Sequence, residues 1–277
     1  MQAAKARGRT GRRKADFMDS NHFFNVGARW AAMVLAASLI LVSGAVAPAT
    51  AQTPSRPQSL RVGGEDRTYL LSRPATATGP LPTVIALHAA AQTSESFRGY
   101  FGLEATAAKE GFVAVYPQGI GRVWNDGRPA AMRLKAVLTP GDDVPFLIAL
   151  VNKLVAEGIA DPTRIYLAGI SNGGFMVERM ACEYPELFAA YGVIMATAPA
   201  NYREECRPAR PVPIMFIHGT ADSVIGWNGF WTPVGATLSA TDSADLYARL
   251  NGCAASDLID LPDREPLDAT SVSVQRW

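Results

Sequence analysis

The chain has 277 residues, 48% of them hydrophobic and 18% charged, and a formal net charge of +1. This length and composition describe a globular chain with one sizeable core, so we expect one folded domain. Seven basic and only two acidic residues precede residue 52, and the rest of the chain is weakly acidic. No basic patch remains that would bind nucleic acid, which excludes this class of partner.

The basic N-terminus leads into an uncharged stretch between Arg29 and Arg56. The apolar part of this stretch is followed by Ala49-Thr50-Ala51, the small-x-small pattern of a signal-peptidase site. Residues 1–51 are therefore expected to be an export signal that is cleaved after Ala51. A membrane anchor is the alternative, but the strongly apolar core, residues 31–42, is shorter than the roughly 20 residues that span a bilayer. The mature protein is therefore expected to be secreted, either periplasmic or extracellular, and free of the membrane.

Residues 52–60 are expected to form a polar linker, so the folded region is expected to span 61–277. Within it, short apolar runs alternate with longer segments of helical periodicity, a pattern that favours an α/β fold around a mostly parallel sheet. Because the runs are almost continuously apolar, we expect the strands to be buried on both faces. The expected strands are residues 82–89, 112–119, 164–170, 191–198 and 212–219.

Two segments between these strands are expected to be helices. In the first, apolar residues recur at helical spacing over 147–154, after Asp142 and Asp143, which suit a helix cap and first turn. A metal-binding pair of carboxylates is the alternative at these two positions, but helix capping explains them better. The second helix is expected to follow Ser171 and to end at Pro185.

The segment GISNGGF, residues 169–175, contains a serine between two glycines in the spacing G-x-S-x-G. Serine hydrolases use this spacing to present a nucleophile on a sharp strand-to-helix turn, where backbone N–H groups face a developing oxyanion. Ser171 stands between an expected strand and an expected helix, as this turn requires. We therefore expect Ser171 to be a nucleophile; a capping serine in a glycine-rich turn is the alternative.

A carboxylate follows at the end of a later expected strand. Asp222 comes after the strand at 212–219, and the order serine, acid, histidine is typical of the triad that accompanies such a serine turn. The carboxylate would hold an imidazole in the correct tautomer and stabilise its charged form. A turn-forming aspartate is the alternative, because Gly219 and Thr220 are also turn residues.

Four blocks of sequence carry a resemblance to a known family. They are LHAAAQTSESF, YPQGIGRVWNDGRP, DPTRIYLAGISNGGFMVERMACEYPELFAA and RPVPIMFIHGTADSVIGW. In these blocks the chain resembles the secreted polyhydroxybutyrate depolymerase and feruloyl esterase group of α/β-hydrolases. The resemblance implies a mostly parallel twisted sheet with helices on both faces, and an extracellular carboxylic ester hydrolase that uses no cofactor.

The resemblance also assigns roles to particular residues. It implies Ser171 as the nucleophile, Asp222 as the triad acid and the backbone N–H of Asn172 as one oxyanion-hole donor. The second donor is expected in the loop after the first expected strand, where the family usually has His-Gly. Here that stretch is His88-Ala89-Ala90, so the donor is expected at Ala90.

The chain contains three histidines, His22, His88 and His218. His22 lies in the expected export signal, and the resemblance indicates structural roles for the other two. The catalytic histidine is expected in a loop after the strand that begins near 272–275, and the fold is expected to lack its last strand or strands and helix. Two hypotheses stay open: an exported serine esterase whose sequence here is C-terminally incomplete, or a non-catalytic α/β-hydrolase-like binding protein that keeps the ester-binding pocket.

Trp124, Asn125 and Trp227 fall in loops at expected strand ends, where aromatic faces suit a feruloyl ring or a polyester chain. Packing of the loops alone is the alternative. The sequence does not choose among hydroxyalkanoate esters, feruloyl esters and acetylated sugars, and the oligomeric state stays open.

A disulfide is expected between Cys182 and Cys206, because export places the chain where disulfides persist. Cys182 lies on the helix after Ser171 and Cys206 lies shortly before the strand at 212–219, so both suit the same side of the sheet. Three free thiols are the alternative. The resemblance implies a further downstream cysteine as the partner of Cys253.

Overall fold

The computed structural model describes residues 56–128, 141–232 and 235–277 of the chain. The expected export signal, residues 1–51, lies outside these described ranges. Within them, no helix is long and apolar enough to cross a membrane. The described ranges lie within the region that we expect to remain after export.

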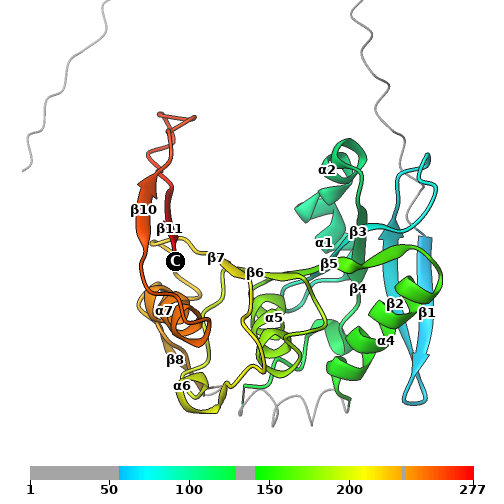
Figure 1. Ribbon diagram of the computed structural model, residues 1–277, viewed down its shortest axis with the longest axis horizontal. Helices are drawn as coiled ribbons and strands as arrows, with labels where there is room; N and C mark the ends of the chain where they lie inside the picture. Colours follow the sequence, from blue (N-terminus) through cyan, green and yellow to red (C-terminus); the bar gives the residue numbers. More distant parts are fainter. Residues whose placement is uncertain (1–55, 129–140, 233–234) are drawn as a thin grey trace, which may run out of the picture. The chain divides into compact units, whose positions relative to one another are not determined.

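A seven-stranded, mostly parallel sheet forms the centre of the described region (Figure 1). Its strand order is β1-β2-β4-β3-β5-β6-β7. β2 pairs antiparallel with both β1 and β4, and every neighbouring pair from β4 to β7 is parallel. The sheet expected from the sequence is confirmed, with the five expected strands as β3 to β7. The strands are β1 (Arg56–Val62), β2 (Glu65–Ser72), β3 (Leu81–Leu87), β4 (Val113–Pro117), β5 (Ala160–Ile170), β6 (Ala190–Ile194) and β7 (Ile214–Ile217).

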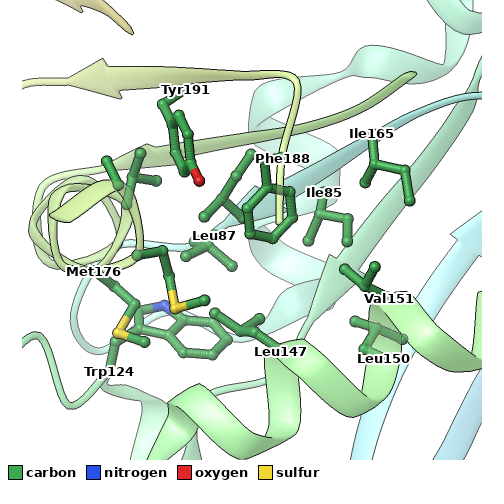
Figure 2. Close-up of a cluster of buried hydrophobic side chains, with 14 of the residues drawn as sticks. Ile85, Leu87, Trp124, Leu147, Leu150, Val151, Ile165, Met176, Phe188 and Tyr191 are labelled. Atoms are coloured by element: carbon green, nitrogen blue, oxygen red, sulfur yellow. The ribbon is translucent and has the colours of Figure 1, made fainter. Parts of the chain in front are cut away.

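Helices cover both faces of this sheet. Ala86 and Tyr116 point to one face, where they pack in a cluster with Phe97 of α1. Ile85 and Leu87 point to the opposite face, where they join the cluster formed with α4 and α5 (Figure 2). The expectation of helices on both faces is therefore confirmed. The helices are α1 (Ser94–Phe101), α2 (Leu103–Glu110), the 3-10 turn η1 (Ile120–Arg122), α4 (Asp143–Ala156), α5 (Asn172–Glu183), α6 (Tyr202–Glu205) and α7 (Ala240–Leu250).

Both expected helices begin and end close to the residues that the sequence indicates. The Asp142 side chain caps α4 by accepting a hydrogen bond from the Val144 N–H at 3.2 Å. Asp143 is fully buried and pairs with the guanidinium of Arg67 at 2.6 Å. The alternative of a metal-binding aspartate pair is not needed, because capping and this ion pair account for the two carboxylates. α5 ends at Glu183, just before Pro185.

The linker expected at residues 52–60 is wrong for residues 56–60, which belong to β1. Arg56 to Val62 pair with Leu71 to Glu65 of β2. From Pro57 to Val62 the strand alternates exposed and partly buried residues, so it is an edge strand with one half-buried face. Its polar composition hides this strand from sequence analysis, and the folded region includes residues 56–60.

The strand expected near 272–275 is present but pairs outside the seven-stranded sheet. β11 (Ser273–Arg276) pairs antiparallel with β10 (Asp257–Asp260) in a separate two-stranded sheet. A second small pair joins β8 (Trp231–Thr232) to β9 (Gly235–Ala236). In the described residues, β7 therefore forms one edge of the seven-stranded sheet.

The parallel strands bring several polar residues to one edge of the sheet. Parallel strands present their carboxyl ends at the same edge, and ligands of open α/β sheets bind there. His88 follows β3, Gln118 follows β4, Ser171 follows β5 and His218 follows β7. The carboxyl edge of the sheet is therefore the candidate location of a ligand-binding or catalytic site.

Candidate active site

Ser171 sits on a sharp turn between β5 and α5, and its backbone is in a rare conformation. Its φ is 53° and its ψ is −118°, a region that residues other than glycine seldom adopt. Such a conformation costs on the order of 1 to 3 kcal/mol and persists only where the surroundings impose it. Here the Ser171 N–H donates to the Ile194 carbonyl at 2.9 Å, and its carbonyl accepts from the Phe175 N–H at 3.0 Å.

The two flanking glycines are required by close backbone contacts. A Cβ added to Gly169 would come within 3.0 Å of the Gly173 carbonyl oxygen. A Cβ added to Gly173 would come within 3.0 Å of the carbonyl oxygens of Leu87 and His88. The G-x-S-x-G spacing is therefore explained by the geometry: the turn folds onto itself and onto the end of β3.

The two predicted oxyanion donors are the backbone N–H groups of Asn172 and Ala90. Asn172 is the first residue of α5, and the first N–H groups of a helix have no partner within it. Ala90 lies in the loop after β3, where the Ala89 N–H donates to Oε1 of Gln92 at 3.1 Å and the Ala91 N–H donates to the Arg122 carbonyl at 2.8 Å. Among the described residues, neither the Asn172 nor the Ala90 N–H has a hydrogen-bond acceptor. Their assignment as oxyanion donors stays a prediction.

Asp222 is held by the turn that follows it. Its Oδ1 accepts hydrogen bonds from the N–H groups of Val224 at 2.8 Å and Ile225 at 2.9 Å. Its Oδ2 lies 3.9 Å from Nε2 of His218, beyond hydrogen-bond distance. Asp222 therefore does form a turn, as the alternative hypothesis expected. Because the turn uses only Oδ1, the other carboxylate oxygen, Oδ2, is left for a further donor.

Buried His88 has both ring nitrogens occupied. Its Nε2 accepts a hydrogen bond from the Gly119 N–H at 3.0 Å and lies 3.1 Å from Nε2 of Gln118. Its Nδ1 must then carry the proton, which it donates to the Ala89 carbonyl at 2.8 Å. Burial lowers the pKa of His88, so the ring is held neutral. No lone pair remains on this histidine to take a proton from a serine.

His218 is also tied to the backbone of its own loop. Its Nε2 donates to the Ile225 carbonyl at 2.7 Å. Its Nδ1 is buried without a hydrogen-bond partner in the described part of the chain. Within that part, no hydrogen bond joins the Ser171 hydroxyl to either His88 or His218, and His22 lies outside it.

The structure corrects the expectation for Trp124 and leaves two other residues as candidates. Trp124 is 1% exposed, and its Nε1 donates to the His88 carbonyl at 2.9 Å. Its ring is packed in the core beside Met176 (Figure 2), so it has no face to offer a substrate. The neighbouring Asn125 N–H donates to Oδ2 of Asp143 at 2.6 Å, and this hydrogen bond anchors the loop that contains Trp124. Trp227 is partly exposed, and substrate binding by Asn125 and Trp227 stays a prediction.

The structure pairs Cys182 with Cys206, the pair expected from the sequence. Their Cα atoms lie 5.5 Å apart, and the disulfide joins α5 to the segment after α6. Cys253 is exposed and unpaired among the described residues.

Sequence reasoning missed the side-chain partners of the loop at residues 124–128. Asn172 binds the backbone of Trp124 and the buried carboxylate of Asp126, which lie more than forty positions earlier in the chain. Asp126 also pairs with Arg128 at 2.7 Å. The block GRVWNDGRP contains these residues, but nothing in its composition tells an exposed substrate loop from a buried one.

The fold and the serine turn are those of an α/β-hydrolase. Solved structures support this class: a thermostable esterase matches with a TM-score of 0.51 and 20% identity over 72% of this chain and 51% of that one. The native form of a protein called sOPH matches with a TM-score of 0.52 and 18% identity over 71% of this chain and 75% of that one. At such low identity these matches show the fold alone.

Within this class, residues 67–203 match the family model described as esterase PHB depolymerase. Over these residues, just under half of the chain, the protein is similar to this family, and the resemblance seen in the sequence is confirmed.

Relatives are spread over several ester hydrolases. The protein named "Putative esterase NocK" from Nocardia uniformis subsp. tsuyamanensis is 29% identical over 69% of this chain and 58% of its own length. Feruloyl esterase B from Piromyces equi is 30% identical over 53% of this chain and 28% of its own length. Poly(3-hydroxybutyrate) depolymerase from Ralstonia pickettii is 29% identical over 47% of this chain and 28% of its own length. The matched part of the chain thus spans between about a quarter and three fifths of these relatives.

Proposed function

We propose that this chain is an exported serine hydrolase of carboxylic esters that acts through an acyl-enzyme. Ser171 is the nucleophile, Asp222 the acid of the triad, and the N–H groups of Asn172 and Ala90 the oxyanion hole. The observation that carries the proposal is the backbone of Ser171, φ 53° and ψ −118°, held between two glycines that no larger residue can replace without a clash. The strain serves to expose the hydroxyl at the carboxyl edge of the sheet, next to the start of α5.

The proposed reaction needs a base for each of its two steps. In the first, Oγ of Ser171 bonds to the ester carbonyl carbon, and the serine proton passes to the base. The carbonyl oxygen becomes an oxyanion that the two N–H groups stabilise. When the carbon–oxygen bond to the alcohol breaks, the alcohol takes that proton; water then releases the acid from Ser171 in the same way. An imidazole oriented by Oδ2 of Asp222 is the base that this mechanism requires.

A non-catalytic binding protein is the second candidate, and one observation favours it. In the described residues no histidine is hydrogen-bonded to Ser171, and both ring nitrogens of His88 are occupied. A serine hydroxyl is a weak nucleophile without a neighbouring base. A protein of this second kind would keep the ester pocket and bind esters without cleaving them.

Covalent labelling tests which serine is the nucleophile. The full chain is incubated with excess fluorophosphonate in the presence of imidazole, which can take the Ser171 proton, and the adduct is located by peptide mass spectrometry. Ser223→Ala is the matched control, because Ser223 is an exposed serine next to Asp222. We expect one adduct, on Ser171, in the parent and in Ser223→Ala, and none in Ser171→Ala. Equal labelling of Ser171→Ala would remove the assignment.

The substrate is proposed as a class, a carboxylic ester. Relatives are named for feruloyl, acetylxylan and hydroxybutyrate esters. Ethyl ferulate, acetylated xylan and hydroxybutyrate oligomers are therefore the panel on which binding and hydrolysis should be compared. Export is proposed from residues 1–51; cell fractionation that leaves the full-length, uncleaved chain in the cytoplasm would contradict it.

A further inference from the structure

We propose that the side chains of Asn172, Trp124 and His88 position the oxyanion hole. They are positioning residues: their side chains act through the backbone, and the oxyanion itself binds N–H groups. The inference rests on the proposed function, in which Ser171 is the nucleophile and the N–H groups of Asn172 and Ala90 are the donors. It adds a role for three side chains to a site otherwise built from backbone.

The Asn172 side chain ties the nucleophile turn to the loop after η1. Its Oδ1 accepts a hydrogen bond from the Trp124 N–H at 2.7 Å, and its Nδ2 donates to the Trp124 carbonyl at 3.1 Å. The same Nδ2 donates to Oδ2 of Asp126 at 2.7 Å. Asn172, Trp124 and Asp126 are all buried. A buried amide with this many partners holds one geometry, because each lost hydrogen bond would leave an unsatisfied polar group.

Trp124 carries the connection on to the other side of the oxyanion hole. Its indole Nε1 donates to the carbonyl of His88 at 2.9 Å, and the two rings lie 4.8 Å apart. His88 in turn accepts from the Gly119 N–H and donates to the Ala89 carbonyl. His88 is therefore held through both its backbone carbonyl and its ring, and the ring in turn holds the carbonyl of Ala89, the residue just before Ala90.

The backbone segment that carries Asn172 also lies in direct contact with the end of β3. Gly173, next to Asn172, lies so near the carbonyl oxygens of Leu87 and His88 that a Cβ would come within 3.0 Å of each. The segment bearing the Asn172 donor thus rests on the segment that leads to the Ala90 donor. Two hydrogen-bonded links, Asn172 to Trp124 and Trp124 to His88, fix how they meet.

Backbone strain marks the same junction. Ala91 has φ 66° and Arg122 has φ 63°, both in the left-handed region that residues other than glycine avoid. The Ala91 N–H donates to the Arg122 carbonyl at 2.8 Å, so the two strained residues hold each other. Strain of this kind persists where packing over-determines the backbone. The loop with the Ala90 donor is therefore fixed to the loop with Trp124 at a second point.

An oxyanion donor must lie about 2.7–3.1 Å from the oxyanion, so small displacements of either segment matter. Replacing Asn172 or Trp124 leaves both donors in place, because the donors are backbone groups. If such a variant binds an oxyanion less tightly, the cause is therefore a change in the position of the two donors.

Butylboronic acid tests this without a catalytic base. The Ser171 hydroxyl adds to boron, an O–B bond forms, and the proton is released to the buffer, which leaves a tetrahedral borate anion with an oxygen in the oxyanion hole. The ¹¹B NMR signal moves from its trigonal to its tetrahedral position, and titration gives the affinity. Because this is an equilibrium measurement, it does not depend on the rate of proton transfer.

Three variants are compared with the parent. Trp124→Phe keeps the ring and removes the N–H that binds His88; we expect roughly tenfold weaker adduct formation. Asn172→Asp places a carboxylate against Asp126; we expect a loss of roughly a hundredfold. The control is Tyr191→Phe, which removes a hydrogen bond of 2.7 Å to the Tyr184 carbonyl in the same core and should bind as the parent does.

The outcomes separate the two proposals. If Trp124→Phe and Asn172→Asp fold, as judged by near-UV circular dichroism, and bind like the parent, the positioning role is wrong and the nucleophile stands. Should Asn172→Asp fail to fold, Trp124→Phe alone decides. If the parent gives no tetrahedral signal, or if its signal persists in Ser171→Ala, the proposed nucleophile is wrong. The positioning role is then wrong as well.

Discussion

The two halves of the candidate site are held in different ways. The nucleophile half, Ser171 with Asn172 and the loop 88–91, is fixed by contacts between residues far apart in the chain, and α5 is buried from Asn172 to Ala181. The acid half, residues 218–225, follows β7, where Met215 is 59% and Ile217 is 49% exposed. Its carboxylate is held by N–H groups only two and three positions away.

Because the two halves are held in different ways, a substitution that disrupts one half should leave the geometry of the other half intact. A geometry fixed by the core cannot change without cost to the free energy of unfolding of the whole domain. A local turn on an exposed strand end can be altered at small cost. Substitutions in the nucleophile half should therefore lower global stability more than matched substitutions in the acid half.

The largest effect is expected for Gly173→Ala. Its Cβ would collide with the carbonyl oxygens of Leu87 and His88, both on backbone that cannot move aside. We expect the free energy of unfolding, measured in urea, to fall by about 3 kcal/mol or more. Gly99→Ala is the control: Gly99 lies in α1 with no atom within 4 Å of an added Cβ, and alanine there should stabilise slightly. Equal stability of the two variants would contradict the account of the serine turn.

Loss of the disulfide should come next. Cys182 and Cys206 are 24 positions apart, and closing a loop of that length stabilises by about 3 kcal/mol through the unfolded chain. Cys206→Ala should lower the melting temperature of the oxidised protein, and Cys253→Ala should not, because Cys253 is exposed and unpaired in the described residues. Peptide mapping of the exported protein that finds Cys182 as a free thiol would refute the pairing.

In the acid half, Asp222→Ala should cost only about 1 kcal/mol, the loss of an acceptor for two exposed or half-buried N–H groups. Asp222→Asn keeps an oxygen acceptor and should leave the free energy of unfolding almost unchanged. Urea denaturation of both variants measures this. A loss in Asp222→Ala as large as that in Gly173→Ala would show that the acid half is not locally held.

The smallest expected effect is a pH dependence from His88. Burial lowers its pKa in the folded state, whereas in the unfolded chain its pKa is about 6.5. As the pH falls below about 6.5, the unfolded chain gains a proton that the folded state refuses, so the free energy of unfolding decreases. His88→Gln cannot titrate, and its stability should change less than the parent's between pH 7.5 and pH 5.5. An identical change in both proteins would contradict a neutral, buried His88.

The sequence predicts the nucleophile half better than its surroundings. The glycines around Ser171 and the apolar run before it are local signals, so the strand, turn and helix follow from neighbouring residues. β1 is missed because an edge strand with one half-buried face needs few apolar residues. Trp124 is misplaced because the hydrogen bonds that bury its loop reach Asn172, 48 positions away, and no local pattern records them.

Hydrolysis of p-nitrophenyl butyrate as a function of added imidazole tests the central claim most directly. The claim is that the turn at Ser171 has the geometry of a catalytic nucleophile, and that the base this serine needs is not among the described residues. Without imidazole, the chain and its Ser171→Ala variant should hydrolyse the ester equally slowly; with imidazole, the parent's rate should rise above that of the variant, because free imidazole takes the serine proton. Turnover of the chain alone at roughly ten per second, abolished in Ser171→Ala, would contradict the claim, since such rates are typical of enzymes with a complete catalytic site.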